Sequence, residues 1–302
     1  MQTPEAEARR IIDELLTAAG WMVQDYARRN LGAARGLAIR EFPLTTGAAD
    51  YLLLVDRRPI GVVEAKKVGF PLIGVEPQAA KYSVGSRAHM TPWHDPLPFL
   101  YQSTGQETRF TSLLDPEPRS RSVFAFHRPE TLAAWATEPL SLRARLRAMP
   151  PVDQGRLWPV QLDTLQKLER SLAADRPRAL VHMATGSGKT YTAVSAVYRL
   201  IKHGGARRVL FLVDRRNLGT QAWGEFQSYE TPDDGRKFTE LYNVQLMSAN
   251  VLDPSAKVVI TTVQRLYSML AGEEDMDPMA EEVSLWEQED ELGAAPKTVT
   301  YN

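Results

Sequence analysis

Cysteine is absent from this sequence of 302 residues. Its absence excludes a disulfide framework and thiolate metal sites, and it fits a cytoplasmic protein. Long apolar runs are also missing, because no stretch approaches the ~18 residues that would indicate a membrane-spanning helix. The start, Met1-Gln2-Thr3-Pro4-Glu5, lacks the basic and apolar regions of a signal peptide. The sequence therefore predicts a soluble, cytoplasmic globular protein without a membrane partner.

Basic residues are missing from one region. Between Arg265 and Lys297 there is no Lys or Arg, but there are ten acidic residues. Because the net charge of the whole chain is only −1, the remainder is moderately basic, which permits a nucleic-acid partner without requiring one. We expect the acidic run to form a solvated, mobile loop. The length and the 43% hydrophobic content allow two domains.

A glycine-bearing turn lies between an apolar run at residues 179–183 and a helical pattern that begins with Lys189. Strand, loop and helix in this order form the context of a phosphate-binding loop, although Met183 replaces the first glycine of the general pattern. The glycines let backbone N–H groups converge on a phosphate at the positive end of the helix dipole. Lys189 would contact the β- and γ-phosphates of ATP, and the hydroxyl of Thr190 would ligate Mg²⁺. The predicted loop residues are Thr185, Gly186, Ser187, Gly188, Lys189 and Thr190.

Two β-rich runs, residues 45–55 and 60–66, flank a polar turn and predict an antiparallel hairpin. If the turn is centred at residues 57–58, Asp50 lies across from Ala65. Alternation along a strand places the residues on either side of Ala65 on one face of the sheet. The hairpin thus gathers three charged side chains at one end.

Those side chains are Asp50, Glu64 and Lys66, and they suit the hydrolysis of a phosphodiester. Asp50 and Glu64, with the carbonyl of Ala65, offer hard oxygen ligands to Mg²⁺. Lys66 would orient the attacking water and stabilise charge on the phosphate. An ordinary surface ion pair between Glu64 and Lys66 is the alternative. The pattern D-x13-E-A-K resembles the PD-(D/E)xK nuclease signature, although Pro43 is too far from Asp50 to supply its proline.

A further element, residues 77–82, has the form P-Q-x-x-x-Y and predicts a helix start with Gln78 and Tyr82 on one face. It resembles the helix that follows the E-x-K strand in one branch of these nucleases, which implies positioning roles for Gln78 and Tyr82. In those families an acid on the preceding helix often joins the site. Here that helix is expected over residues 4–19, and its candidates are Glu5 and Glu7.

Two later apolar runs, residues 207–214 and 257–263, predict buried parallel strands with polar residues at their carboxyl ends, where α/β proteins bind ligands. With the variant loop A-T-G-S-G-K-T, these motifs resemble those of superfamily 2 helicases. The resemblance implies contacts to the DNA backbone, which carry no sequence specificity. The residues concerned are Arg215, Arg216, Thr261, Thr262 and Gln264. For Arg215, a local salt bridge with Asp214 is the alternative to a DNA contact.

Gln161 precedes the loop by about one helix. In superfamily 2 motors a glutamine at this place reads the edge of adenine, so the resemblance implies this role for Gln161. An ordinary glutamine at a helix start is the alternative.

Pro150-Pro151 marks a predicted domain boundary, because two prolines end the preceding helical pattern. The order nuclease, connector, translocase resembles the motor (R) subunits of type I restriction enzymes over nearly the whole chain. This resemblance implies an α/β chain with a PD-(D/E)xK nuclease domain and connector in residues 1–150. Residues 151–302 would be a truncated RecA-like, parallel-sheet P-loop domain. The implied cofactors are Mg²⁺ and ATP, and the implied partners are double-stranded DNA and the modification (methyltransferase) and specificity subunits.

Two other functions remain open from the sequence. One is a superfamily 2 helicase or repair ATPase with a degenerate nuclease domain, against which the complete set of Asp50, Glu64 and Lys66 argues. The other is a non-catalytic DNA-binding module that docks to other subunits. No acidic pair follows a strand-like run after Val263, so we expect weak ATP binding without DNA-stimulated hydrolysis.

Overall fold

A computed structural model describes residues 4–44, 47–72, 90–176 and 178–284. The chain divides into two compact units, Met1–Ala144 and Arg145–Asn302. This division falls inside helix α4 (Leu142–Arg147), slightly before the boundary predicted from the sequence. In the described ranges, no helix is long and apolar enough to cross a membrane.

The first unit contains a mixed sheet with its strands in chain order from β1 to β7. β1 and β2 pair in parallel, as do β4 and β5, and the other neighbours are antiparallel. The strands are β1 (Met22–Asp25), β2 (Gly36–Leu44), β3 (Gly47–Val55), β4 (Arg58–Ala65), β5 (Phe99–Ser103), β6 (Thr108–Ser112) and β7 (Arg121–Val123). A short 3-10 helix, η1 (Tyr26–Arg28), follows β1.

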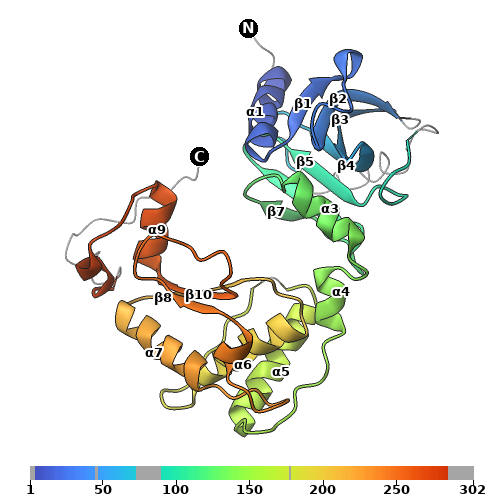
Figure 1. Cartoon of the computed structure of the whole chain (residues 1–302). Coiled ribbons are helices and arrows are strands. Elements are labelled where there is room, and N and C mark those ends of the chain that lie inside the picture. Colours follow the sequence, from blue (N-terminus) through green and yellow to red (C-terminus); the bar gives the residue numbers. More distant parts are fainter. Residues whose placement is uncertain (1–3, 45–46, 73–89, 177, 285–302) are drawn as a thin grey trace. The chain divides into compact units, whose positions relative to one another are not determined.

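Apolar side chains cover both faces of this sheet. Helices α1 (Pro4–Ala18) and α3 (Pro129–Thr137) are labelled in Figure 1. Their residues Leu16 and Leu132 belong to the hydrophobic cluster on one face of the sheet. The other face is covered by partly buried residues of connecting segments, such as Leu31. The predicted first helix is confirmed, and Gly20 follows it with a φ of +88°, a value that glycine adopts at low cost.

The predicted hairpin of β3 and β4 forms, but its turn lies one residue earlier than expected. Asp56 and Arg57 occupy the turn with φ values of 51° and 64°. Positive φ at both central residues is what a two-residue type I′ turn requires, and this turn matches the twist of the flanking strands.

A register shift between Leu53 and Leu54 changes the pairing beyond the turn. Tyr51 pairs with Val63, so Asp50 comes opposite Glu64. The sequence predicts Ala65 at this place. Because directly opposed residues of antiparallel strands are the closest cross-strand neighbours, the correction moves the two carboxylates toward each other.

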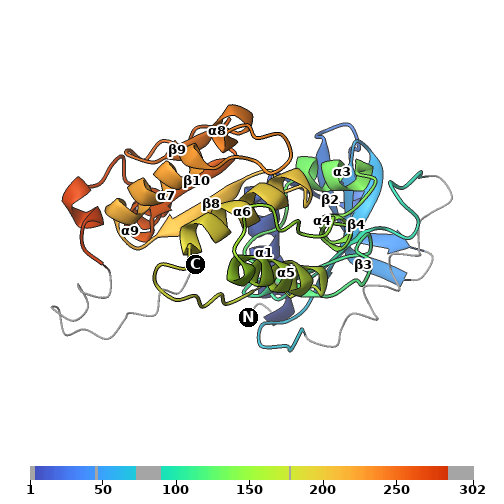
Figure 2. The same cartoon turned by 90° about the horizontal axis from the view of Figure 1, so that it is seen from below.

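The second unit contains a parallel sheet in the order β8-β10-β9. The strands are β8 (Val209–Val213), β9 (Val244–Leu246) and β10 (Val258–Thr262). The helices are α5 (Pro159–Ala173), α6 (Lys189–Lys202), α7 (Arg216–Ser228), α8 (Phe238–Leu241) and α9 (Val263–Ala271), followed by the 3-10 helix η2 (Pro278–Glu281). Helices α6 and α7 lie side by side (Figures 1 and 2) and pack on one face, where Phe226 meets Ile260. On the other face Met269 of α9 packs near Val259. The predicted α/β class and the parallel pairing of this sheet are confirmed.

Two expectations for the second unit are wrong. Strand β8 is not buried, because it is an edge of the sheet, and Leu210 and Leu212 are 49% and 45% exposed. The apolar run before the phosphate loop is not a strand, and Leu180 is 96% exposed. A strand is held by hydrogen bonds to a neighbouring strand, and no strand of the described residues pairs with this run.

Gly61 allows β5 to approach β4 closely, and a Cβ at this position would lie 2.5 Å from the carbonyl oxygen of Phe99. We expect Gly61→Ala to destabilise the first unit by about 1–3 kcal/mol, because the backbone must move. Thermal unfolding measures the change. Gly224→Ala is the matched control, since no atom lies within 4 Å of the added Cβ in α7 and alanine favours helix. An unfolding temperature of Gly61→Ala at or above that of the parent would contradict the close approach.

Candidate functional site

Glu64 and Lys66 meet at the end of β4. The Nζ of Lys66 donates a hydrogen bond to Oε1 of Glu64 at 2.8 Å, and only 7% of Glu64 is exposed. The backbone N–H of Lys66 donates to the carbonyl of Ser103 at 2.8 Å, so pairing with β5 continues through this residue. The predicted placement of Glu64 and Lys66 on one face is confirmed.

Asp50 lies at the same end of the hairpin and is held from two sides. One carboxylate oxygen accepts a hydrogen bond from the N–H of Ala65 at 2.8 Å, which fixes Asp50 beside the neighbours of Ala65. The other accepts from Nη2 of Arg9 at 2.6 Å. Arg9 comes from α1 and also forms an ion pair with Glu41 at 3.0 Å. Arg9 was not among the sequence-predicted residues, because nothing local links α1 to β3.

The donor set suits Mg²⁺ better than a metal that requires a full set of side-chain ligands. In the described ranges, no group of three or more His, Cys, Asp or Glu side chains is arranged to hold a metal ion. Mg²⁺ needs only one or two carboxylates and keeps several waters. Asp50 and Glu64 meet this requirement, and in this structure Arg9 and Lys66 compensate their charges.

Gln102 is a site residue that sequence reasoning missed. It lies on β5 as the register partner of Glu64, so the two side chains share a face of the sheet. Gln102 is 3% exposed, and its Oε1 has no hydrogen-bond partner among the described residues. A buried, unsatisfied amide oxygen is unfavourable and calls for an explanation such as a ligand or a water. The sequence feature that could have identified Gln102 is a polar amide within an otherwise apolar strand.

Four other residues are predicted for the nuclease site. Gln78 and Tyr82 lie outside the described residues, as does the side chain of Glu5, so their roles stay predictions. Glu7 forms an ion pair with Arg10 at 2.7 Å within α1 rather than joining Asp50.

The loop before α6 has a backbone suited to a phosphate. Gly186 and Gly188 have φ values of +80° and +77°, in the left-handed region that favours glycine. Nothing lies within 4 Å of a Cβ built on Gly186, so space for a ligand is open there. Gly188 is the N-cap residue before α6 and makes no side-chain cap, so an anion can satisfy the first N–H groups of the helix. The Nζ of Lys189 donates to the carbonyl of Met183 at 3.5 Å, which folds the ammonium over the loop.

Gln161 joins α5 to this loop. Its Nε2 donates to the carbonyl of Ser187 at 3.1 Å, and its Oε1 accepts from the N–H of Trp158 at 3.0 Å. A Cβ on Gly188 would lie 2.2 Å from Nε2 of Gln161, so this glycine also makes room for the amide. Gln161 thus holds the loop and also occupies a helix-start position, while its contact with adenine stays a prediction.

A pocket of about 390 Å³ opens beside α6. It includes Leu157, Tyr191 and Tyr229 in its lining, and Tyr191 directly follows Thr190 of the loop. The volume and the mixture of aromatic and polar walls match the sites that bind small molecules. Because Tyr191 is the first residue after the loop, the pocket is a candidate site for the base and ribose of a nucleotide, although no residue of the loop itself lines it.

The predicted DNA-contacting residues lie at the carboxyl ends of β8 and β10. Arg215 and Arg216 have partly exposed side chains, and Nε of Arg215 lies 3.6 Å from Asp214, the local ion pair that the sequence leaves open. Thr261, Thr262 and Gln264 are at most 9% exposed. A DNA backbone therefore does not reach these last three in the present arrangement.

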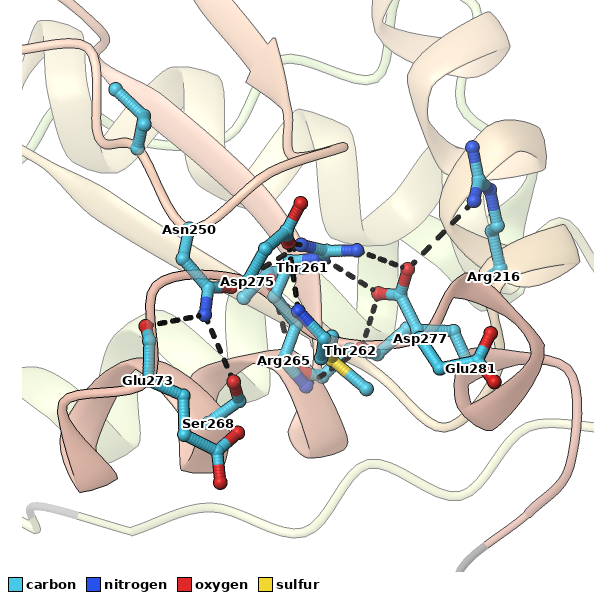
Figure 3. A network of polar contacts seen from close by, with 12 residues as sticks. Arg216, Asn250, Thr261, Thr262, Arg265, Ser268, Glu273, Asp275, Asp277 and Glu281 are labelled. Atoms are coloured by element: carbon cyan, nitrogen blue, oxygen red, sulfur yellow. Dashed lines mark hydrogen bonds and ion pairs between the residues drawn. The ribbon is translucent and has the colours of Figure 1, made fainter.

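The described part of the acidic run is solvated, as the sequence predicts, with one exception. Glu273, Glu274, Asp275, Asp277 and Glu282 are exposed. Glu281 is 2% exposed and binds Arg265, which is fully buried (Figure 3). Because a buried arginine needs a carboxylate partner, this ion pair holds Glu281 in the interior.

Comparisons with known proteins find similarity to restriction enzyme subunits in both units of the chain. Residues 154–291 match the family model described as type III restriction enzyme, res subunit. Residues 25–111 match the one described as type I restriction enzyme EcoKI endonuclease subunit second domain. The EcoKI endonuclease subunit of Escherichia coli strain K12 is 28% identical over 327 residues, covering 91% of this chain and 28% of that protein. This chain is thus similar, over most of its length, to an endonuclease subunit of a type I restriction enzyme.

Other endonuclease subunits are also similar. SauCOLORF180P of Staphylococcus aureus strain COL is 24% identical, over 74% of this chain and 25% of its own length. EcoAI of Escherichia coli is 25% identical, over 71% and 26%. The chain thus spans about a quarter of the length of these relatives. A solved structure described as a fragment of an HsdR subunit from Vibrio vulnificus YJ016 has 18% identity and a TM-score of 0.34, with coverage of 90% of this chain and 49% of that one.

Replacement of Gln102 tests whether its amide oxygen is unsatisfied. We expect Gln102→Met, which removes this oxygen at similar side-chain size, to raise the free energy of unfolding by about 1 kcal/mol. Thermal unfolding measures the change. Gln106→Met, at an exposed position after β5, is the control and should leave the stability unchanged. Lower stability of Gln102→Met would mean that the amide oxygen has a partner.

Proposed function

We propose that this chain forms the N-terminal part of the R subunit of a type I restriction endonuclease. In the complete enzyme this subunit cleaves double-stranded DNA in a Mg²⁺-dependent reaction and couples cleavage to ATP-driven translocation. Residues 1–150 are the nuclease domain with its connector, and residues 151–302 begin the motor. The carrying observation is the gathering of Asp50, Glu64 and Lys66 at one end of the β3–β4 hairpin.

The nuclease chemistry follows from these side chains. Asp50 and Glu64 would hold Mg²⁺, which when bound supplies charge stabilisation and an acidified water. Lys66, 2.8 Å from Glu64, stabilises negative charge that develops on the attacked phosphate. The unpaired Oε1 of Gln102 accepts a hydrogen bond from the attacking water and orients it. Arg9 holds the carboxylate of Asp50 in place between turnovers.

The motor unit would bind ATP. Gly186 and Gly188 present backbone N–H groups to the phosphates, Lys189 contacts the β- and γ-phosphates, and Thr190 ligates Mg²⁺. Gln161 couples the loop to the base, which enters the pocket beside Tyr191.

The similarity to type I endonuclease subunits supports the remaining partners. DNA would be contacted by Arg215 and Arg216 and, once their buried side chains are uncovered, by Thr261, Thr262 and Gln264. The modification and specificity subunits would complete the enzyme and supply methylation and target recognition. The complex would act in the cytoplasm.

The nuclease proposal is tested by three single substitutions. We expect Asp50→Ala, Glu64→Ala and Lys66→Ala each to lower Mg²⁺-dependent plasmid cleavage on the order of 100-fold or more, because one missing group disables a two-carboxylate site. Circular dichroism checks that each variant is folded. Asp56→Ala, in the turn at the other end of the hairpin, is the control and should cleave normally. Full metal-dependent cleavage by Glu64→Ala would remove the proposed site.

The nucleotide proposal predicts binding without turnover. We expect residues 1–302 to bind ATP weakly, Lys189→Ala to abolish this binding, and Lys167→Ala, an exposed lysine of α5, to leave it unchanged. None of the described strands β8, β9 and β10 ends in the acidic pair that positions Mg²⁺ and water for hydrolysis. DNA-stimulated phosphate release on the order of 1 s⁻¹, lost in Lys189→Ala, would contradict the expectation.

A further inference from the structure

The acidic segment 273–284 lies on the predicted DNA-contacting residues at the carboxyl end of β10. The hydroxyl of Thr262 donates to Oε1 of Glu281 at 2.7 Å. The Nε2 of Gln264 donates to the carbonyl oxygen of Val283 at 2.8 Å. The segment therefore occupies the space that a DNA backbone needs in order to reach these side chains.

The carboxylate of Glu281 is bound as a phosphate would be bound (Figure 3). Arg265 donates from Nε to Oε1 at 3.0 Å and from Nη2 to Oε2 at 2.7 Å, a two-pronged contact that guanidinium groups make with carboxylates and phosphates alike. Thr262 adds a third donor, and Nη1 of Arg216 lies 3.9 Å from Oε2. Two arginines and a hydroxyl thus converge on one anionic group.

Glu281 carries its charge at neutral pH despite its burial. Burial disfavours the ionised form, but the hydrogen bonds from Arg265 and Thr262 outweigh it, and the pKa of Glu281 lies below its ordinary value. The hydrogen bond with Glu281 in turn raises the pKa of Arg265. The site therefore already holds a full negative charge of the kind that a DNA phosphate supplies.

Polar contacts attach the rest of the segment. Ser284 donates to Asp214 at 3.0 Å, and Asn250 donates to the carbonyl of Glu273 at 3.1 Å. In the described part of the chain, the hydrophobic clusters of this unit include no side chain from the segment, and Met279 is 72% exposed. Because water or phosphate can replace polar contacts at small net cost, the segment can leave without opening a hydrophobic core.

We propose that Thr262, Arg265 and Arg216 form a binding site for a DNA phosphate, and that Glu281 blocks this site until residues 273–284 are displaced. The inference rests on the proposed DNA-binding function of this edge. The segment competes with DNA for the same donors, and its exposed carboxylates repel DNA while it remains in place. The affinity for DNA is therefore reduced by the fraction of molecules in which the segment is closed.

Glu281→Gln weakens the closed state without changing the size of the side chain. A neutral amide makes weaker hydrogen bonds to arginine than a carboxylate does, so we expect the whole chain to bind DNA about tenfold more tightly. Fluorescence anisotropy with a short fluorescein-labelled duplex, in EDTA to prevent cleavage, measures the affinity. Glu282→Gln removes the same charge from the exposed neighbouring residue and should change the affinity less than about twofold. The double variant Glu281→Gln/Arg216→Ala should lose the increase in DNA affinity.

A second measurement uses the unaltered chain and so does not depend on the folding of a variant. Hydrogen–deuterium exchange of the amides in residues 273–284 should become faster when the duplex is added, while the amides of β10 stay protected. If the chain binds the duplex but exchange in the segment is unchanged or slower, the inference is overturned, Glu281 is a structural ion pair, and the proposed DNA binding stands. Equal affinities of Glu281→Gln and Glu282→Gln would lead to the same conclusion. If neither the parent chain nor Glu281→Gln binds the duplex, the proposed DNA surface fails together with the inference.

Discussion

A buried carboxylate needs a cation beside it, and this requirement shapes both functional regions of the chain. Glu64 is 7% exposed and lies 2.8 Å from Nζ of Lys66, and Glu281 is 2% exposed and lies 2.7 Å from Nη2 of Arg265. Leaving either carboxylate unpaired would cost several kcal/mol. The first pair sets the side chains at the end of β4, and the second holds the segment after α9 against β10. Asp50 is secured in the same way by Arg9.

These ion pairs also make each region able to exchange partners. In the proposed nuclease site, a metal ion on Asp50 and Glu64 would replace the positive charge of Arg9 and Lys66. In the proposed phosphate site, a phosphate on Arg265 would replace the negative charge of Glu281. In both exchanges the buried charge would stay compensated, so the change would require local motion rather than unfolding.

The phosphate loop keeps its form without a strand in front of it. Gly186 and Gly188 hold the left-handed backbone, and the amide of Gln161 clamps the carbonyl of Ser187 from α5. The loop is thus supported from the helical side, and the backbone of residues 178–184 is not paired in the described sheet. The glycine loop therefore does not depend on a strand that pairs with the half-exposed edge strand β8.

The sequence by itself determined the features that depend on neighbouring residues. Helical and strand periods are local, so the sequence predicts the apolar stripe of α1, the glycines before α6, the β3–β4 hairpin and the E-A-K spacing. Even there, the shift in β3 moved Asp50 opposite Glu64, since a bulge depends on packing rather than on pattern. Only the tertiary structure decided which distant residues meet: Arg9 with Asp50, Gln102 beside Glu64, and Glu281 on Thr262. The order of strands and the path of each connection set these meetings, and no local period encodes either of them.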